Sequence, residues 1–87
     1  MANGYTVSGE VVQDDGGVIF DIYSDDEPDV LKRGVIGPDA LEALNGGPFE
    51  NAADVIDEYR EKIASTAGDH WLANPKNPTI ILGRGHF

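Results

Sequence analysis

The spacing of apolar residues changes once along this chain of 87 residues, and that change limits the folds it can adopt. Over the first 36 residues, apolar and polar side chains largely alternate. Beyond them, apolar residues recur at intervals of three or four. Alternation is typical of strands with one buried face, and the longer interval is typical of amphipathic helices. The pattern therefore predicts a sheet built mainly by the first part of the chain and helices built mainly by the second.

Three strands are predicted in the first part. The buried face of the first, at residues 5–12, is expected to comprise Tyr5, Val7, Gly9 and Val11. Asp14-Asp15-Gly16-Gly17 favours a hairpin turn, because glycine and aspartate tolerate positive φ, and alternation resumes over residues 18–23. Residues 24–29, five polar residues and a proline, are expected to form a loop before a third strand at 30–36. The result is an antiparallel meander.

A short helix, a longer helix and a last strand are predicted in the second part. Gly37-Pro38-Asp39 favours a helix start, since proline fits the first turn and an early aspartate suits the positive end of the dipole. Asn45-Gly46-Gly47-Pro48 ends that helix, and Asn51 is a suitable N-cap for the longer one. The apolar stripe of the longer helix is Ala52, Ile56, Tyr59, Ile63, Ala67 and Trp71. Thr79–Leu82 is nearly all apolar, which favours an interior strand.

The predicted fold class is therefore α+β, in the order β-β-β-α-α-β. A chain of this length forms one small domain, residues 1–87. Both helices are expected to pack on one face of an antiparallel sheet. The side chains expected in the shared core are Val18, Phe20, Ile22, Leu41, Ile56, Ile63 and Ile81.

Residues 18–87 also contain hydrophobic residues of particular types in a distinctive order. It comprises Val35-Ile36, Pro38-Asp39-Ala40-Leu41, Phe49, Tyr59-Arg60, Ile63-Ala64, Trp71 and His86-Phe87. This order resembles a family of small bacterial proteins of unknown function and of about this length, in which a β-meander precedes two helices and a final strand. His86 stands where that family usually has an acidic residue. The resemblance implies an α+β fold and brings no activity with it.

Acidic residues are concentrated at one end of the chain. Residues 1–29 hold eight carboxylates and no lysine or arginine, whereas the other 58 residues hold eight acids and six bases, within a formal net charge of −10. This concentration of carboxylates is expected to produce a local negative field, which repels nucleic acid and attracts basic surfaces. The carboxylates predicted to bind a partner are Asp14, Asp15, Asp21, Asp25, Asp26, Glu27 and Asp29.

Part of this acidic segment has the spacing of a calcium loop. Asp25, Glu27 and Asp29 alternate as its first three ligands would, but Val30 and Ile36 stand where the loop needs glycine and glutamate. A solvated acidic loop is therefore expected there. The aspartates of the predicted hairpin turn are likewise explained by turn chemistry.

The other residues that could form a catalytic, metal or phosphate site also have structural explanations. His70 and His86 are the only imidazoles, and without cysteine a zinc site would need both of them and carboxylates from elsewhere. The serines lack a nucleophile elbow and a nearby base. Gly83-Arg84-Gly85 lacks the strand-to-helix context of a phosphate loop. We therefore predict no catalytic residue, no metal ligand and no cofactor.

The function predicted from these observations is that of a non-enzymatic acidic interaction module binding a basic protein surface, such as that of a nucleic-acid-binding protein. Its most specific form is a phage-type, nucleic-acid-mimicking inhibitor of a host defence complex, because carboxylates along a hairpin imitate phosphates. The alternatives are a bacterial housekeeping protein whose acidity serves solubility, and a small hydrolase or cation-binding protein. The chain has no cysteine, no bilayer-length apolar run and no signal-peptide order, so we expect a soluble, cytoplasmic protein that contacts neither membrane nor nucleic acid directly.

Overall fold

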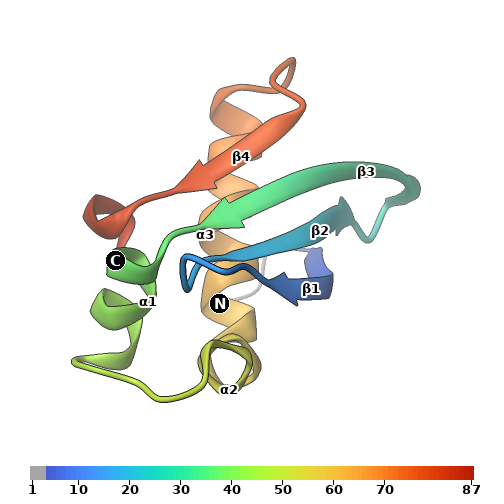
Figure 1. The fold of residues 1–87 in the computed structure, drawn as a ribbon. Coiled ribbons are helices and arrows are strands. Elements are labelled where there is room, and N and C mark those ends of the chain that lie inside the picture. Colours follow the sequence, from blue (N-terminus) through green and yellow to red (C-terminus); the bar gives the residue numbers. More distant parts are fainter. Residues whose placement is uncertain (1–3) are drawn as a thin grey trace.

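The computed structural model describes residues 4–87 as one sheet and a set of helices (Figure 1). The elements are β1 Tyr5–Val12, β2 Val18–Ser24, β3 Glu27–Ile36, α1 Pro38–Asn45, α2 Ala52–Glu58, α3 Arg60–Ala73, β4 Thr79–Leu82 and the 3-10 helix η1 Arg84–His86. The four strands lie in the order β1-β2-β3-β4. The predicted α+β class and the meander are confirmed.

The sheet is mixed rather than antiparallel. β1, β2 and β3 pair antiparallel, but β4 pairs parallel to β3. The chain leaves β3, passes through the helices and returns in the same direction, which is the connection a parallel pair requires. The prediction of a purely antiparallel sheet was therefore wrong at its last strand.

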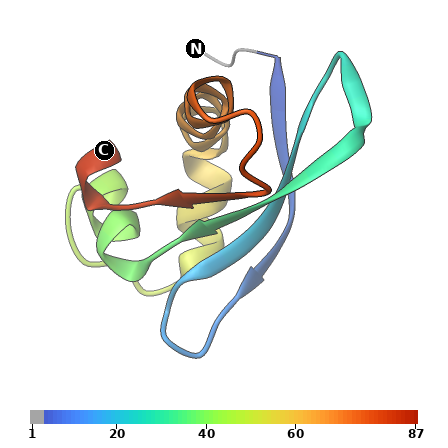
Figure 2. The ribbon, with the colours of Figure 1, turned by 90° about the horizontal axis from the view of Figure 1, so that it is seen from above.

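The helices cover one face of the sheet only, as the view along the sheet shows (Figure 2). Alternate strand residues point to that face and meet the apolar sides of the helices. The buried apolar residues are Val7, Val18, Phe20, Ile22, Ile36, Ala40, Leu41, Leu44, Ala52, Val55, Ile56, Ile63, Ala64, Ala67, Ile80 and Leu82. All the predicted core residues are among them except Ile81.

Ile81 is 67% exposed, so its predicted burial was wrong. The parallel register places Ile80 opposite Gly34 and Leu82 opposite Ile36, on the covered face. Ile81, between them, points to the uncovered face. β4 is also an edge strand, not the interior strand that its apolar run favoured.

A bulge changes the face of β1. The register runs from Ser8 opposite Asp21 to Val11 opposite Ile19, so β1 contains one extra residue at this point. Gly9 supplies the positive φ of 61°. The bulge ends the alternation predicted for this strand, and it leaves Val11 58% exposed instead of buried.

The segment predicted as a loop is mostly strand. Ser24 pairs with Glu27, so only Asp25 and Asp26 form the turn between β2 and β3. The register is irregular just after the pair Tyr23–Leu31, and the β3 residues between Glu27 and Leu31, which include Pro28, have no partner in β2. Proline is tolerated there because that part of the strand donates no ladder hydrogen bond to β2.

The predicted long helix is divided into α2 and α3 at Tyr59, whose φ of −110° and ψ of 22° are not helical. The apolar stripe nevertheless continues across the break, since Ile56 and Ile63 on either side are fully buried. Arg60, the first residue of α3, donates a hydrogen bond from Nη1 to the carbonyl of Val7 at 2.9 Å. The break therefore lies where the helical layer is attached to β1.

Two glycines allow aromatic rings to approach the backbone. A Cβ on Gly34 would lie 2.1 Å from the ring of Phe20, its cross-strand neighbour. A Cβ on Gly68 of α3 would lie 2.5 Å from the ring of Tyr5. Both rings therefore pack in space that any other residue would fill.

We expect Gly34→Ala to lower the free energy of unfolding by about 2 kcal/mol, because the buried Phe20 ring must leave its position to admit the methyl group. Urea denaturation measures this change. Gly85→Ala is the matched control, since a Cβ there meets nothing within 4 Å and the backbone has no positive φ. Equal denaturation midpoints for the two variants would show that the ring does not depend on Gly34.

Candidate functional site

The seven carboxylates predicted to bind a partner fall into three groups in the structure. Asp14 and Asp15 lie in the turn between β1 and β2, which we call the first acidic turn. The second acidic turn comprises Asp25, Asp26, Glu27 and Asp29, at the junction of β2 and β3. Asp21 lies between them on β2, on the uncovered face, where its neighbours in register are Ser8 and Arg33.

The structure does not bring the two acidic turns together. They lie at opposite ends of β2, which at about 3.3 Å per residue separates them by about 20 Å. This distance is about twice the Debye length at 0.1 M salt. The acidic segment therefore provides two separate centres of negative potential, where the sequence suggested one field.

Backbone and hydroxyl groups hold some of these carboxylates in place. Asp15 Oδ1 accepts a hydrogen bond from the Gly17 N–H at 2.9 Å, and Asp25 Oδ1 accepts one from Thr6 Oγ1 at 2.6 Å. Within residues 4–87, the ion pairs are those of Arg60 with Glu10 and Asp57. The seven carboxylates are therefore not neutralised by ion pairs with the described part of the chain.

Glu10 differs from the other N-terminal acids because the protein uses it internally. Both of its carboxylate oxygens accept hydrogen bonds from Arg60, from Nη2 and, at 3.1 Å, from Nη1. Arg60 also donates from Nη2 to Asp57 at 2.5 Å. The hydrogen bonds from Arg60 lower the pKa of Glu10 below its usual range, an effect that partial burial opposes. The Glu10 carboxylate in turn raises the pKa of Arg60.

Lys32 is a second base that the fold uses internally. It points to the covered face and is only 9% exposed. Its Nζ donates to the carbonyls of Pro75 and Asn77, each at 2.8 Å, and lies 4.5 Å from the centre of the Trp71 ring. These contacts hold the connection from α3 to β4 against the sheet. Sequence reasoning assigned Lys32 no role. Lys32 and Ile36 are four residues apart on the same strand, so their side chains point to the same face of the sheet.

The uncovered face of the sheet carries an apolar row that sequence reasoning did not identify. Its members face one another in register across all four strands: Val11, Ile19, Val35 and Ile81. The two end members are more than half exposed and the two central ones are partly buried. With strands about 4.8 Å apart, the row is about 14 Å long. Only the bulge in β1 and the parallel register of β4 complete it, and neither can be read from periodicity.

A hollow of about 400 Å³ connects this apolar row to the first acidic turn. Its lining includes Asp14 and Asp15 of the turn and Ile19 and Val35 of the row. An apolar wall beside two carboxylates suits a side chain with a hydrocarbon stem and a cationic end.

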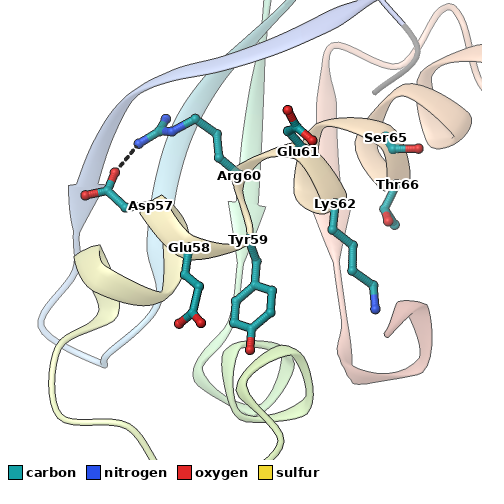
Figure 3. Close-up of a pocket in the computed structure, with 8 residues that line it drawn as sticks. All are labelled: Asp57, Glu58, Tyr59, Arg60, Glu61, Lys62, Ser65 and Thr66. Atoms are coloured by element: carbon teal, nitrogen blue, oxygen red, sulfur yellow. Dashed lines mark hydrogen bonds and ion pairs between the residues drawn. The ribbon is translucent and has the colours of Figure 1, made fainter. Parts of the chain in front are cut away.

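A larger hollow, of about 770 Å³, lies at the junction of α2 and α3 (Figure 3). Its lining residues are Asp57, Glu58, Tyr59, Arg60, Glu61, Lys62, Ser65 and Thr66. Arg60 points toward Asp57, whereas Glu58, Tyr59 and Lys62 point to the opposite side (Figure 3). The lining contains no histidine, the base that most often activates a serine nucleophile in hydrolases.

The two histidines lie together, with their Nε2 atoms 2.7 Å apart. The Gly83 N–H donates to Nδ1 of His86 at 2.8 Å, so this nitrogen carries no proton, and His86 donates from Nε2 to His70. Binding zinc through both Nε2 atoms would require that proton to move to Nδ1 of His86, which would break the hydrogen bond from Gly83. Residues 4–87 also contain no group of three or more His, Cys, Asp or Glu side chains placed to hold a metal ion. The geometry favours a structural pair that joins η1 to α3.

Comparisons of the chain with protein-family models, with curated proteins and with solved structures find no match. The resemblance to small bacterial proteins of unknown function therefore rests on the spacing and hydrophobic type of the residues quoted for it. Among residues 4–87, no helix has both the length and the apolar composition needed to cross a bilayer.

We expect Glu10→Gln to destabilise the protein by about 1 kcal/mol at pH 7, since it removes a charge from a pair that stays partly exposed to solvent. Because the pKa of Glu10 is lower in the folded state, its contribution is present above the unfolded pKa of about 4.3 and is lost as pH falls through the folded pKa. The difference from the parent protein should therefore shrink from roughly pH 5 downward in a series of urea titrations. A difference that stays constant to pH 3 would contradict this assignment.

Proposed function

We propose that the protein is a non-enzymatic interaction module that binds a basic surface of another protein through seven carboxylates, those of its two acidic turns and Asp21. The observation that carries this proposal is that none of these seven carboxylates has an ion-pair partner within residues 4–87. Two of the six bases, Lys32 and Arg60, are engaged by internal contacts. These two bases are therefore engaged elsewhere and do not pair with the seven carboxylates.

The charge arrangement favours a folded protein as the partner. Two acidic turns about 20 Å apart attract basic groups placed at a similar separation. A duplex, in contrast, presents about one charge per 1.7 Å of its axis without interruption. Between the turns, this surface has only Asp21, beside the base Arg33. The nucleic-acid-mimicking inhibitor is therefore a narrower form of the proposal, and this spacing supports it less well.

The housekeeping alternative assigns the acids to solubility alone. It predicts that replacing acids on the helices and replacing acids on the turns have the same effect on association with a partner. The two explanations therefore differ in whether the position of the carboxylates matters, and matched sets of substitutions separate them.

We expect replacement of the second acidic turn, Asp25, Asp26, Glu27 and Asp29, by Asn or Gln to slow association with the partner about tenfold at low salt. The amides keep the shape and remove long-range attraction. The partner is first captured from a lysate of the native host, and association is then followed by surface binding kinetics. Raising the salt concentration from 0.1 to 1 M shortens the Debye length from about 10 to about 3 Å. This change should slow association of the parent protein with the partner by a similar factor.

The control set is Asp54, Glu58, Glu61 and Asp69, which are exposed acids of α2 and α3. Asp57 is left out because its loss would also break the pair with Arg60. The control variant should bind like the parent. If the two variants bind alike, or if the turn variant binds as the parent does, the acidity serves solubility and the proposal fails.

A further inference from the structure

The apolar row of Val11, Ile19, Val35 and Ile81 is an unusual feature for the uncovered face of so acidic a protein. On the covered face the buried apolar residues form one core with the helices packed on it. On the uncovered face the row has no covering element among residues 4–87 (Figure 2). Its two end members are 58% and 67% exposed. An apolar strip bordered by charge is typical of a surface that another protein covers.

We propose that this row is the docking site of the partner, and that the docking element is a basic amphipathic helix lying across the four strands. The inference rests on the proposed function and specifies its contact surface. It adds a short-range apolar contact to the long-range attraction of the acidic turns.

The length of the row fits a helix. A rise of 1.5 Å per residue places about nine residues along its roughly 14 Å. An amphipathic helix presents apolar side chains at i, i+3 or i+4, and i+7, a stripe about 10 Å long. Such a stripe covers most of the row, as apolar helix faces cover grooves in other complexes.

The surroundings of the row specify the charge of that helix. On one side, the hollow of about 400 Å³ is lined by Ile19 and Val35 together with Asp14 and Asp15. A lysine or arginine on the edge of the helix can lay its hydrocarbon stem on the two aliphatic residues and bring its cation to the carboxylates. Oδ1 of Asp15 already accepts the Gly17 N–H, so its other oxygen is the one that meets the cation.

The other side of the row is nearly neutral, which orients the helix. There Asp21 lies opposite Arg33 in register, so the acid and the base offset each other. The basic edge of the helix is therefore expected over the first acidic turn, and its less charged edge over Asp21.

Two other occupants are disfavoured by the same charges. A second copy of the chain would bring two molecules of charge −10 together and place like carboxylates beside each other. Nucleic acid is repelled by this surface for the same reason. A basic partner gains from both the apolar contact and the electrostatic attraction.

The test uses a synthetic helical peptide with leucines on one face and lysines beside them, and a scrambled peptide of the same composition. Calorimetry measures their binding to the full chain at low salt. We expect the amphipathic peptide to bind the parent at least about tenfold more tightly than the scrambled one. The double variant Val11→Thr, Ile81→Thr should remove this preference, because threonine keeps the β-branch and replaces apolar contact surface by hydroxyl.

Leu72→Thr is the matched control, since Leu72 is exposed to the same fraction, 67%, but lies on α3. It should bind the peptide like the parent, and thermal melts should show that all the variants are folded. Equal binding of both peptides, or an unchanged affinity in the double variant, would overturn the docking site. No binding of the amphipathic peptide to the parent at millimolar concentration would overturn it as well.

A further variant separates this inference from the proposed function. The double variant Asp14→Asn, Asp15→Asn should weaken the binding of both peptides. Its amide at position 15 keeps an oxygen that can accept the Gly17 N–H. If this charge variant weakens binding while the apolar double variant does not, the acidic module stands and the apolar docking site fails. If neither variant changes binding, the acidic-module proposal loses its support too.

Discussion

The covering of the sheet on one face only is the constraint on which the rest of this structure depends. Alternate residues of a strand point to opposite faces, so the register that seats Phe20 over Gly34 beneath the helices also aligns Ile19 with Val35 on the other side. The chain supplies enough helix for one layer. The uncovered face therefore follows from the way the core is built, and its composition determines what the protein can contact.

Internal contacts engage two of the six basic residues of the chain. Arg60 attaches the start of α3 to β1 through Val7 and Glu10, and Lys32 holds the connection before β4 through two carbonyls and Trp71. Burying a cation is costly unless its donors are satisfied, and here the partners of Lys32 are carbonyls rather than carboxylates. The acids of the two turns thus keep their charge available for a partner.

Sequence periodicity predicted the elements better than their arrangement. The alternation through Phe20 and the stripe through Ile63 correctly gave the meander and the helical layer, because each depends on neighbours along the chain. The face of Val11 depends on the bulge at Gly9, and the face of Ile81 on a parallel register with β3; both are set by tertiary packing. The acidic residues of the candidate surface were evident from composition, but the apolar row required the register.

The measurement that tests the binding surface most directly is NMR chemical-shift mapping of the labelled protein as the amphipathic basic peptide is added. The account predicts that the perturbed amides cluster on the uncovered face and the first acidic turn, around Asp15, Ile19, Val35 and Ile81. The exposed side of α2 and α3, including Glu58 and Leu72, should remain unperturbed. Perturbations confined to the helices, or spread evenly over all acidic residues, would contradict the account.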